Sequence, residues 1–544
     1  MKKLNLTLSI WLFCMVSVFA QKLSEEEVKK LFEEAWNTSN DIEKASKNKK
    51  ILAEAPDTPY GLHSKAWLEM KKGEIELSVL TLDTLIQKHP EFWQAYCSRA
   101  VCKEFQKKYQ EAIQDYDKAL EINPNVAIIF NNRGLLKYEL NDQQGAIQDY
   151  NKTLEINPKL AQTYYNRGLS KYKIEDISGA IKDYSKAIEI NPKLLGAYLN
   201  RGNLRAKLGD NLGSVQDYNK ILIIDSKNAE AYYNRGVAKA ELGDLEGAMK
   251  DYNKALELNP NFTHVYGNRG ILRDKLGNKQ GAMQDYNKAL EIDPEFAEIY
   301  GNRGILRDKL GNTQGAMQDY NKALEINPKF AEVYLNRGNL KNKLDDRQGS
   351  IQDYDKALEL NPKYSEVYYN RGILKSDLED KKGAMEDYNK ALETNPKYHE
   401  AYYNRGVLKT ELNDEQGGLK DFNKALEINP KFHQAYYNRA VLKAKSGDQQ
   451  GALNDYNKAL GVNPKLTQAY VNRGVLKDEL GDIQGAIEDY NKAITLNPKF
   501  AEAYYNRGVA KAKLGNKQGT CTDWNKAKEL GLIQVDSLIQ QYCK

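Results

Sequence analysis

The chain has 544 residues, more than a single hydrophobic core usually organises, so its length predicts several domains or a linear array. Its 80 Lys and Arg residues nearly balance its 75 Asp and Glu residues, and the net charge of +5 is spread over interleaved charges of both signs. Because nucleic-acid-binding proteins gather basic residues on one face, this pattern predicts no nucleic-acid partner.

The first 20 residues have a composition unlike that of the rest of the chain. Lys2 and Lys3 precede an apolar run that closes at Ala20. A basic start, a short apolar run and a small closing residue are typical of a secretory signal peptide. The run is shorter than a comfortable membrane span and no second one follows, so we expect residues 1–20 to be removed and no transmembrane segment to remain; an uncleaved anchor is the alternative. This interpretation places the mature protein in the periplasm or outside the cell.

Residues 21–90 contain weaker helical patterns. The segment from Pro59 to Pro90 keeps the 34-residue spacing of the later chain, whereas the segment from Leu23 to Pro56 reads as a more degenerate helix pair. We expect both segments to cap the amino-terminal end of the array, because the end repeats of such arrays need a covered stacking face.

Thirteen copies of one 34-residue pattern fill residues 91–532, and we number them repeats 1 to 13. Place 1 is Trp93 in repeat 1 and Ala297 in repeat 7. Each repeat holds two helical patterns that are separated by a turn such as Gly311-Asn312 and closed, in most repeats, by Asn-Pro. Asn312 is placed to cap the second helix, and the closing proline prevents the helix from continuing.

This period and layout resemble the tetratricopeptide repeat. The matching residues in repeat 7 are Tyr300, Gly304, Ala316, Tyr320, Ala323 and Pro328, at places 4, 8, 20, 24, 27 and 32. The resemblance implies an all-α fold, a right-handed superhelical solenoid of antiparallel helix pairs with capping helices at its ends. A hairpin of this size cannot bury its apolar side alone, whereas stacked copies bury one another's.

Residues 533–544 differ from the repeats and are expected to form a carboxy-terminal capping helix. Their apolar residues recur at the i, i+3, i+4 and i+7 spacing of one helical face. These residues are Val535, Leu538, Ile539 and Tyr542.

Four cysteines follow the predicted signal peptide. Cys97 and Cys102 lie about 140° apart around one predicted helix, so they cannot bridge within it. Cys521 and Cys543 are candidates for a disulfide in an oxidising compartment, although the sequence alone does not pair them.

Helical phase assigns the residues of each repeat to different contacts. Places 4, 8 and 11, which include Tyr300 and Gly304, are predicted to contact the second helix of the same repeat. Places 3, 10 and 14, occupied in repeat 7 by Ile299, Leu306 and Leu310, are predicted to pack against the neighbouring repeat.

Place 6 lies opposite both of these strips and is asparagine in twelve of the thirteen repeats. Asparagine is a poor helix former, so helix propensity does not explain its recurrence. Local hydrogen bonding, exposure to water and descent from one duplicated ancestor are the alternatives to ligand binding. The twelve residues are Asn132, Asn166, Asn200, Asn234, Asn268, Asn302, Asn336, Asn370, Asn404, Asn438, Asn472 and Asn506.

Place 5, beside the asparagines, is often tyrosine, as at Tyr369, Tyr403 and Tyr437. First helices line the concave side of the superhelix in the family that the chain resembles, so places 5 and 6 are predicted to line a groove. An asparagine at this place also resembles the peptide-gripping inner surface of the repeat domain in protein O-linked N-acetylglucosamine transferases. The amide has one acceptor and two donors, which suit a peptide backbone.

A second set of recurring residues is predicted to be structural. Every repeat has Arg at place 7 and Asp at place 23, represented by Arg303 and Asp319 in repeat 7 and by Arg337 and Asp353 in repeat 8. Asp319 lies between apolar places of the second helix, so it is expected to be partly buried and to need a basic partner. Either Arg303 of the same hairpin or Arg337 of the next is the expected partner.

No motif of catalysis, metal binding or phosphate binding occurs in the chain. Its five histidines have no companions at usable spacing. We therefore predict a protein that is not an enzyme and that has no cofactor and no metal. The favoured function is an exported scaffold that binds proteins or extended peptides along an Asn/Tyr-lined groove. The alternatives are extracytoplasmic glycan binding and a purely structural spacer.

Overall fold

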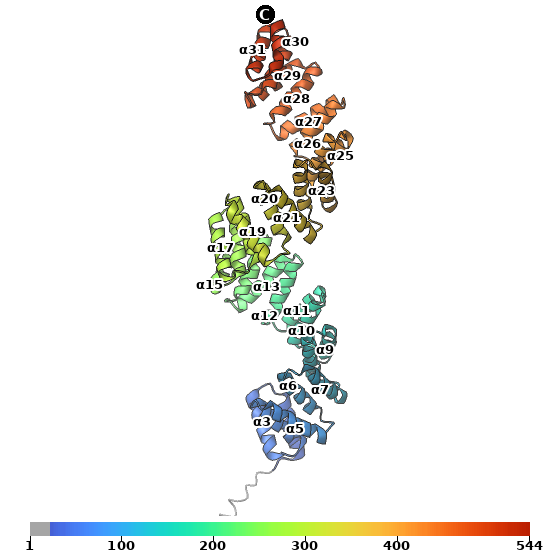
Figure 1. Cartoon of the computed structure of the whole chain (residues 1–544). Helices are drawn as coiled ribbons and strands as arrows, with labels where there is room; N and C mark the ends of the chain where they lie inside the picture. Colours follow the sequence, from blue (N-terminus) through green and yellow to red (C-terminus); the bar gives the residue numbers. More distant parts are fainter. Residues whose placement is uncertain (1–21, 544) are drawn as a thin grey trace, which may run out of the picture. The chain divides into compact units, whose positions relative to one another are not determined.

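The computed structural model describes residues 22–543, so the predicted signal peptide lies outside the described residues. All the secondary structure of the described residues is helical, with 31 α-helices, one short 3₁₀ helix and no strand. Figure 1 follows these helices along the chain. The expected all-α fold of stacked helix pairs is confirmed.

The chain divides into two compact halves, with the boundary between Leu272 and Arg273. The amino-terminal half contains two helix pairs before the repeats and then repeats 1 to 5. Its helices are α2 (Glu25–Asn37), α3 (Asp41–Glu54), α4 (Pro59–Lys71), α5 (Ile75–Lys88), α6 (Trp93–Phe105), α7 (Tyr109–Ile122), α8 (Ala127–Glu139), α9 (Gln143–Ile156), α10 (Ala161–Lys173), α11 (Ile177–Ile190), α12 (Leu195–Lys207), α13 (Asn211–Ile224), α14 (Ala229–Glu241) and α15 (Leu245–Leu258).

The helix α16 (Thr263–Lys275) contains the boundary, and the carboxy-terminal half follows it. The helices of this half are α17 (Lys279–Ile292), α18 (Ala297–Lys309), α19 (Thr313–Ile326), α20 (Ala331–Lys343), α21 (Arg347–Leu360), α22 (Ser365–Asp377), α23 (Lys381–Thr394), α24 (His399–Glu411), α25 (Glu415–Ile428), α26 (His433–Lys445), α27 (Gln449–Val462), α28 (Thr467–Glu479), α29 (Ile483–Leu496), α30 (Ala501–Lys513), α31 (Lys517–Glu529), η1 (Ile533–Val535) and α32 (Asp536–Tyr542).

The turn inside the hairpin of repeat 7 depends on Gly311, Asn312 and Gly315. In repeat 7, Gly311 has φ +81°, a conformation that favours glycine. The side chain of Asn312 then accepts a hydrogen bond of 2.9 Å from the backbone N–H of Gly315, which caps α19. At the other end of α19, Asn327 is no longer helical and Pro328 prevents continuation.

The cap explains why glycine recurs at place 19. A Cβ atom added to Gly315 would lie 2.8 Å from Nδ2 of Asn312, and one added to Gly451 would lie 2.0 Å from Oδ2 of Asp448. The capping side chain folds back over the position that a Cβ atom would occupy. Glycine at place 19 therefore leaves room for the capping side chain, a reason that the sequence alone did not reveal.

The core of each hairpin forms where its two helices cross. A Cβ atom on Gly304 would lie only 2.6 Å from the ring of Tyr320, so glycine at place 8 admits the tyrosine of the second helix. Ile299 and Leu306 are buried, as predicted. The prediction for place 14 is wrong, because Leu310 is 51% exposed. Leu310 is the C-cap residue of α18, where the chain leaves the helix and turns away from the neighbouring repeat.

The carboxy-terminal end of the array is closed as the sequence predicts. Val535 is fully buried against Trp524, and Leu538, Ile539 and Tyr542 pack on the same cluster. A disulfide joins Cys521 of α31 to Cys543, with their Cα atoms 5.6 Å apart.

Candidate functional site

The half-buried arginines and the buried aspartates form a structural network. Nε and Nη2 of Arg303 donate to the two carboxylate oxygens of Asp319 at 3.0 and 2.7 Å, and Nη1 of Arg307 lies 2.9 Å from the same carboxylate. Asp319 is only 2% exposed. Arg337 holds Asp353 in the same way. Each aspartate is therefore paired with the arginine of its own hairpin, the first of the two partners considered from the sequence.

The same arginine also joins successive repeats. Nη1 of Arg303 donates to the side-chain oxygen of Asn287 in the preceding repeat at 2.8 Å, and Arg337 makes the same bond to Asn321. The Arg303 guanidinium additionally lies 5.3 Å from the ring centre of Tyr300. The guanidinium and carboxylate groups are paired within the protein, so they are not available to a ligand.

The asparagines at place 6 occupy a different environment. Eleven of the twelve are half-buried on the first helices, and Asn166 is buried, with 7% of its surface exposed. We call the side chains at places 5 and 6 of repeats 2 to 13 the Asn/Tyr surface.

A tyrosine at place 5 of one repeat accepts a hydrogen bond from the asparagine at place 6 of the next. Nδ2 of Asn404 lies 3.0 Å from the Tyr369 hydroxyl oxygen, and Asn438 and Asn472 make the same bond to Tyr403 and Tyr437 at 3.1 Å. In the amino-terminal half, the same bond joins Asn200 to Tyr165 at 3.3 Å and Asn268 to Tyr233 at 3.1 Å.

Where place 5 is not tyrosine, other side chains supply some of the bonds. Nδ2 of Asn234 donates to Asn203 at 3.3 Å, and Nδ2 of Asn370 donates to Asn339 at 3.1 Å. Asn132 donates to the Tyr116 hydroxyl oxygen at 3.4 Å. The oxygen of Asn166 accepts from Gln162 at 3.0 Å. Local bonding, one of the alternatives left open by the sequence, therefore accounts for part of the asparagine pattern.

The tyrosines of this surface are firmly held. The Tyr369 ring lies 4.8 Å from that of Tyr398, and the Tyr403 ring lies 5.0 Å from that of Phe432. Burial raises the pKa of Tyr369 and of Tyr403, which outweighs the opposite effect of the hydrogen bond from the next asparagine. These hydroxyls are therefore neutral at physiological pH and accept the asparagine N–H.

Three asparagines of the carboxy-terminal half make no side-chain hydrogen bond within the described residues. They are Asn302, Asn336 and Asn506, and each is half-buried. Asn404 and Asn438 also keep a carbonyl oxygen and one N–H without a protein partner in the described part of the chain. The Asn/Tyr surface therefore presents amide donors and acceptors that a ligand can use.

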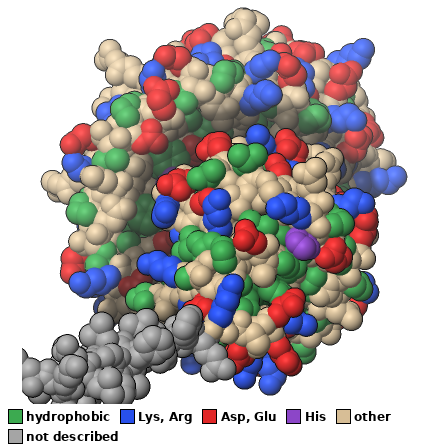
Figure 2. Space-filling model, turned by 90° about the horizontal axis from the view of Figure 1, so that it is seen from below, with side chains coloured by type: hydrophobic (Ala, Val, Ile, Leu, Met, Phe, Trp, Pro, Cys, Tyr) green, Lys and Arg blue, Asp and Glu red, His purple; other side chains and the backbone are tan. Residues whose placement is uncertain are grey.

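Side chains at place 2 extend this surface. Glu298, Glu332 and Glu366 are exposed, and Glu400 is half-buried. In the amino-terminal half, a cavity of about 650 Å³ is lined by residues that include Glu230, Tyr233 and Asn234. On the face shown in Figure 2, acidic and basic side chains are intermixed, in agreement with the charge pattern of the sequence.

The described residues contain no cluster of three or more His, Cys, Asp or Glu side chains that could hold a metal ion. Among the same residues, no helix is long and apolar enough to span a membrane. Cys97 and Cys102 are buried free thiols.

The bond between neighbouring repeats was missed by the sequence reasoning, although a signal for it exists. Tyr233, Tyr369, Tyr403 and Tyr437 are each followed 35 residues later by an asparagine. Helical phase within one repeat hides this relation, because the bond joins place 5 of one repeat to place 6 of the next.

Family models described as tetratricopeptide repeat or TPR repeat match along the array. The matched residues are 93–126, 136–175, 161–194, 229–262, 265–296, 297–330, 331–364, 365–398, 399–432, 422–454 and 479–515. Together these ranges cover more than half of the chain. The comparison with curated proteins found no match.

Several solved structures are similar to parts of the chain. The MamA protein is 27% identical over 32% of this chain and 94% of its own, with a TM-score of 0.29. YrrB, described as a TPR protein with an unusual peptide-binding site, is 27% identical over 34% of this chain and 95% of its own, with a TM-score of 0.31. A tetratricopeptide repeat protein from Parabacteroides merdae is 25% identical over 45% of this chain and 96% of its own, with a TM-score of 0.34.

The hairpins, their contact residues and the family matches lead to one assignment. Glycine at place 8 packs under the aromatic ring at place 24, and alanines at places 20 and 27 are fully buried, as Ala316 and Ala323 show. The chain belongs to the tetratricopeptide repeat family.

Proposed function

We propose that this chain is an exported scaffold that binds proteins or extended peptides along its Asn/Tyr surface. Its family provides protein-interaction scaffolds, which supports the coarse function. The observation that carries the finer proposal is the row of place 6 amides with unused donors and acceptors. An extended peptide presents backbone N–H and C=O groups at regular intervals, so a regular row of amides can bind it regardless of its side chains.

The rigid tyrosines favour this role. A ring that is packed against the next repeat and bonded to its asparagine loses little conformational entropy when a ligand lies on it. Binding energy would be distributed over many repeats, with about 1 kcal/mol from each amide that gains a hydrogen bond.

Two observations support export. The composition of residues 1–20 fits a secretory signal peptide. The disulfide between Cys521 and Cys543 is a bond that persists in oxidising compartments and is rare in the cytosol. Fractionation of cells that produce the full chain, with the amino-terminal residue of the product identified, tests this part: a cytosolic product with intact residues 1–20 would contradict export.

The binding surface is tested by the Asn302→Ala/Asn336→Ala double variant. Neither amide has an internal partner among the described residues, so the variant should keep the stability of the parent chain. It should bind peptides about thirtyfold more weakly, from the loss of about 2 kcal/mol. The control is Gln314→Ala/Gln348→Ala, which removes two exposed amides from the second helices of the same repeats.

A gain of an internal partner provides the converse test. Tyr233 packs 5.1 Å from Phe262 and accepts a bond from Asn268. Gly301 has the equivalent neighbours Phe330 and Val333, so Gly301→Tyr should give Asn336 the bond that it lacks. The variant should keep or gain stability while peptide affinity at this repeat falls.

Ligands are identified by applying the labelled full chain to an array of extended peptides and to an array of glycans. Peptide hits that weaken in the Asn302→Ala/Asn336→Ala variant support the proposal. Glycan hits alone would replace it with carbohydrate recognition, and the absence of hits on both arrays would favour a structural spacer. Unchanged peptide binding in the double variant would show that the place 6 amides are an inherited repeat feature.

A further inference from the structure

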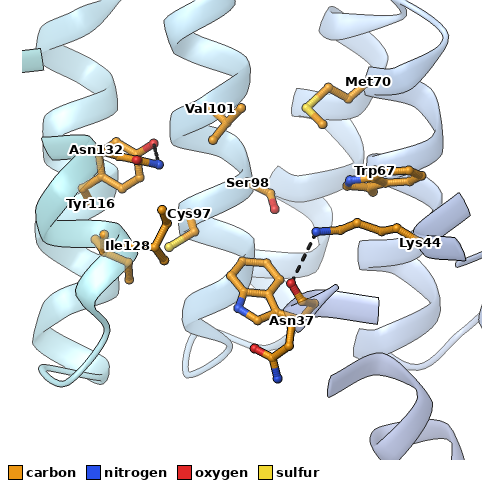
Figure 3. Close-up of a pocket in the computed structure, with 12 residues that line it drawn as sticks. Asn37, Lys44, Trp67, Met70, Cys97, Ser98, Val101, Tyr116, Ile128 and Asn132 are labelled. Carbon is orange, nitrogen blue, oxygen red and sulfur yellow. Dashed lines mark hydrogen bonds between the residues drawn. The ribbon is translucent and has the colours of Figure 1, made fainter. Parts of the chain in front are cut away.

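A cavity of about 380 Å³ lies where the amino-terminal cap meets repeats 1 and 2 (Figure 3). The end of α2 contributes Trp36, α3 contributes Lys44 and α4 contributes Trp67. Repeat 1 contributes Ser98 and Val101 from α6. The walls are therefore mainly aromatic and aliphatic, with one ammonium group among them.

The ammonium group of Lys44 has no carboxylate partner. Its Nζ atom donates to the backbone oxygen of Trp36 at 3.4 Å and lies 5.8 Å from the Trp36 ring centre. No acidic side chain of the described residues lies within 4 Å of it, because the nearby Asp41 pairs with Lys71 at 3.0 Å. By contrast, the half-buried Lys103 in repeat 1 lies 2.9 Å from Asp115.

The electrostatics of the cavity favour an anion. Burial lowers the pKa of Lys44, and an anionic partner would relieve this cost. The adjoining His63 does not supply a second charge, because burial lowers its pKa to about 3. Its Nε2 atom instead lies 2.8 Å from the Ser98 hydroxyl oxygen.

The cavity is not a continuation of the amide row. The row ends at Asn132, which itself lines the cavity, and place 6 of repeat 1 is Ser98, which is bonded to His63. The equivalent residue one repeat length earlier, Ser64, is fully buried. The row of place 6 amides therefore ends at the cavity, which Trp36 and Asn37 at the end of α2 also line.

We propose that this cavity binds a small organic acid, with the carboxylate on Lys44 and an apolar body against Trp67 and Val101. At about 30 Å³ for each water-sized group, the volume accommodates roughly a dozen non-hydrogen atoms. An aryl or branched aliphatic acid of that size matches both the walls and the single positive charge. This binding does not depend on the proposed peptide-binding function, since Asn132 is the only lining residue that also belongs to the Asn/Tyr surface and Lys44 holds the carboxylate.

The test uses the full chain and two ligands of equal shape, 4-phenylbutyrate and its uncharged amide. Trp36 and Trp67 line the cavity, and the Trp93 ring lies 5.3 Å from that of Trp36, so tryptophan fluorescence reports occupancy. The acid is expected to bind about ten- to a hundredfold more tightly than the amide, the range for a charge-assisted hydrogen bond. Calorimetry of the same titrations provides the stoichiometry, which should be one.

Substitutions in α3 test whether Lys44 causes the preference for the acid over the amide. Lys44→Met should bring the acid and amide to nearly equal affinity, and Lys44→Arg should retain the preference. Lys50→Met, at an exposed position of the same helix, is the matched control and should change nothing. Circular dichroism establishes that each variant is folded, and the comparison of acid with amide on the unmodified chain remains decisive if a variant unfolds.

Three results would overturn the inference. The first is equal binding of acid and amide to the unmodified chain, including no binding of either. The second is an acid preference that survives Lys44→Met in a folded variant. The third is tighter binding of the peptide acetyl-Ala-Ala-Phe with a free carboxyl group than of 4-phenylbutyrate, which would assign the cavity to the end of a peptide.

Discussion

Removing the carboxylate of Asp455 is the most direct test of how the repeats hold together. Asp455 is 1% exposed and accepts bonds of 2.7 Å from both Nε and Nη2 of Arg439, while Nζ of Lys443 lies 2.8 Å away. Asp455→Ala leaves two half-buried cations without their shared partner. Breaking a buried pair in this way costs about 3 to 5 kcal/mol.

Hydrogen exchange measured by mass spectrometry shows which repeats lose stability in Asp455→Ala. Because each repeat contacts only its neighbours, the loss should be confined to repeat 11 and the adjoining repeats. A loss of about 3 to 5 kcal/mol corresponds to amide exchange that is faster by a factor on the order of a hundred to a few thousand in α26 and α27. Repeat 11 suits this measurement because its sequence differs from those of its neighbours, whereas repeats 6 and 7 are nearly identical.

Two further variants complete the experiment. Glu427→Ala in repeat 10 removes an exposed carboxylate 2.8 Å from Lys424 and should cost less than about 1 kcal/mol. Replacing Arg439, Lys443 and Asp455 together with Met, Met and Leu should recover much of the loss, because no buried charge is left unpaired. Unchanged exchange in α26 and α27 of Asp455→Ala would refute the view that this network stabilises the stack.

Three further outcomes are expected. Burial opposes ionisation of Asp455, but hydrogen bonds from Arg439 and Lys443 outweigh this effect and hold its pKa below the ordinary 3.8. The stabilising contribution of the carboxylate should therefore be complete above about pH 4 and lost as the pH falls through the lower folded-state pKa. The loss should be measured as faster hydrogen exchange in α27, and Asp455→Asn should not show this pH dependence. Cys521→Ser/Cys543→Ser removes a disulfide between residues 22 apart and should destabilise the carboxy-terminal cap by about 3 kcal/mol. The loss should be measured as faster hydrogen exchange in α31 and α32, and a reducing agent should have the same effect on the parent chain. Gly461→Ala, where a Cβ atom meets nothing within 4 Å, should raise the free energy of unfolding by about 0.5 to 1 kcal/mol, measured as a higher urea midpoint. Gly451→Ala should give no gain because it displaces the Asp448 cap, and equal gains at both positions would contradict the account of place 19.

The fold could be predicted from the sequence because the same 34-residue pattern of contact residues recurs thirteen times. The burial of Ile299 and Leu306 followed from helical phase alone. The exposure of Leu310 could not be predicted in this way, because helical phase assumes that the helix continues, whereas the chain leaves α18 at that residue. The role of Gly315 also could not be predicted from the sequence, because it depends on the capping side chain folding back over the glycine.

The site was predictable only in part, because one repeat considered alone hides contacts between repeats. The sequence identified place 6 as a row of amides, but it did not show that Asn404 and Asn438 each bond to a tyrosine of the preceding repeat. The Lys44 cavity was missed for a different reason. It combines the degenerate cap helices with repeat 1, and no periodicity relates Trp36 or Lys44 to the residues opposite.

The residues at places 5 and 9 determine how much of the next asparagine remains for a ligand, because a tyrosine at place 5 or an asparagine at place 9, such as Asn203 or Asn339, accepts from one of its N–H groups. Tyr369, Tyr403 and Tyr437 each engage one amide N–H of the following repeat, so that stretch presents a fixed aromatic surface with half-used amides. Gly301 offers no hydroxyl, and Asn336 makes no side-chain hydrogen bond within the described residues. Repeats of nearly constant sequence thus acquire different binding properties through these two variable positions. A ligand that depends on hydrogen bonds should prefer the segment around Asn336, and one that depends on stacking should prefer repeats 9 to 11.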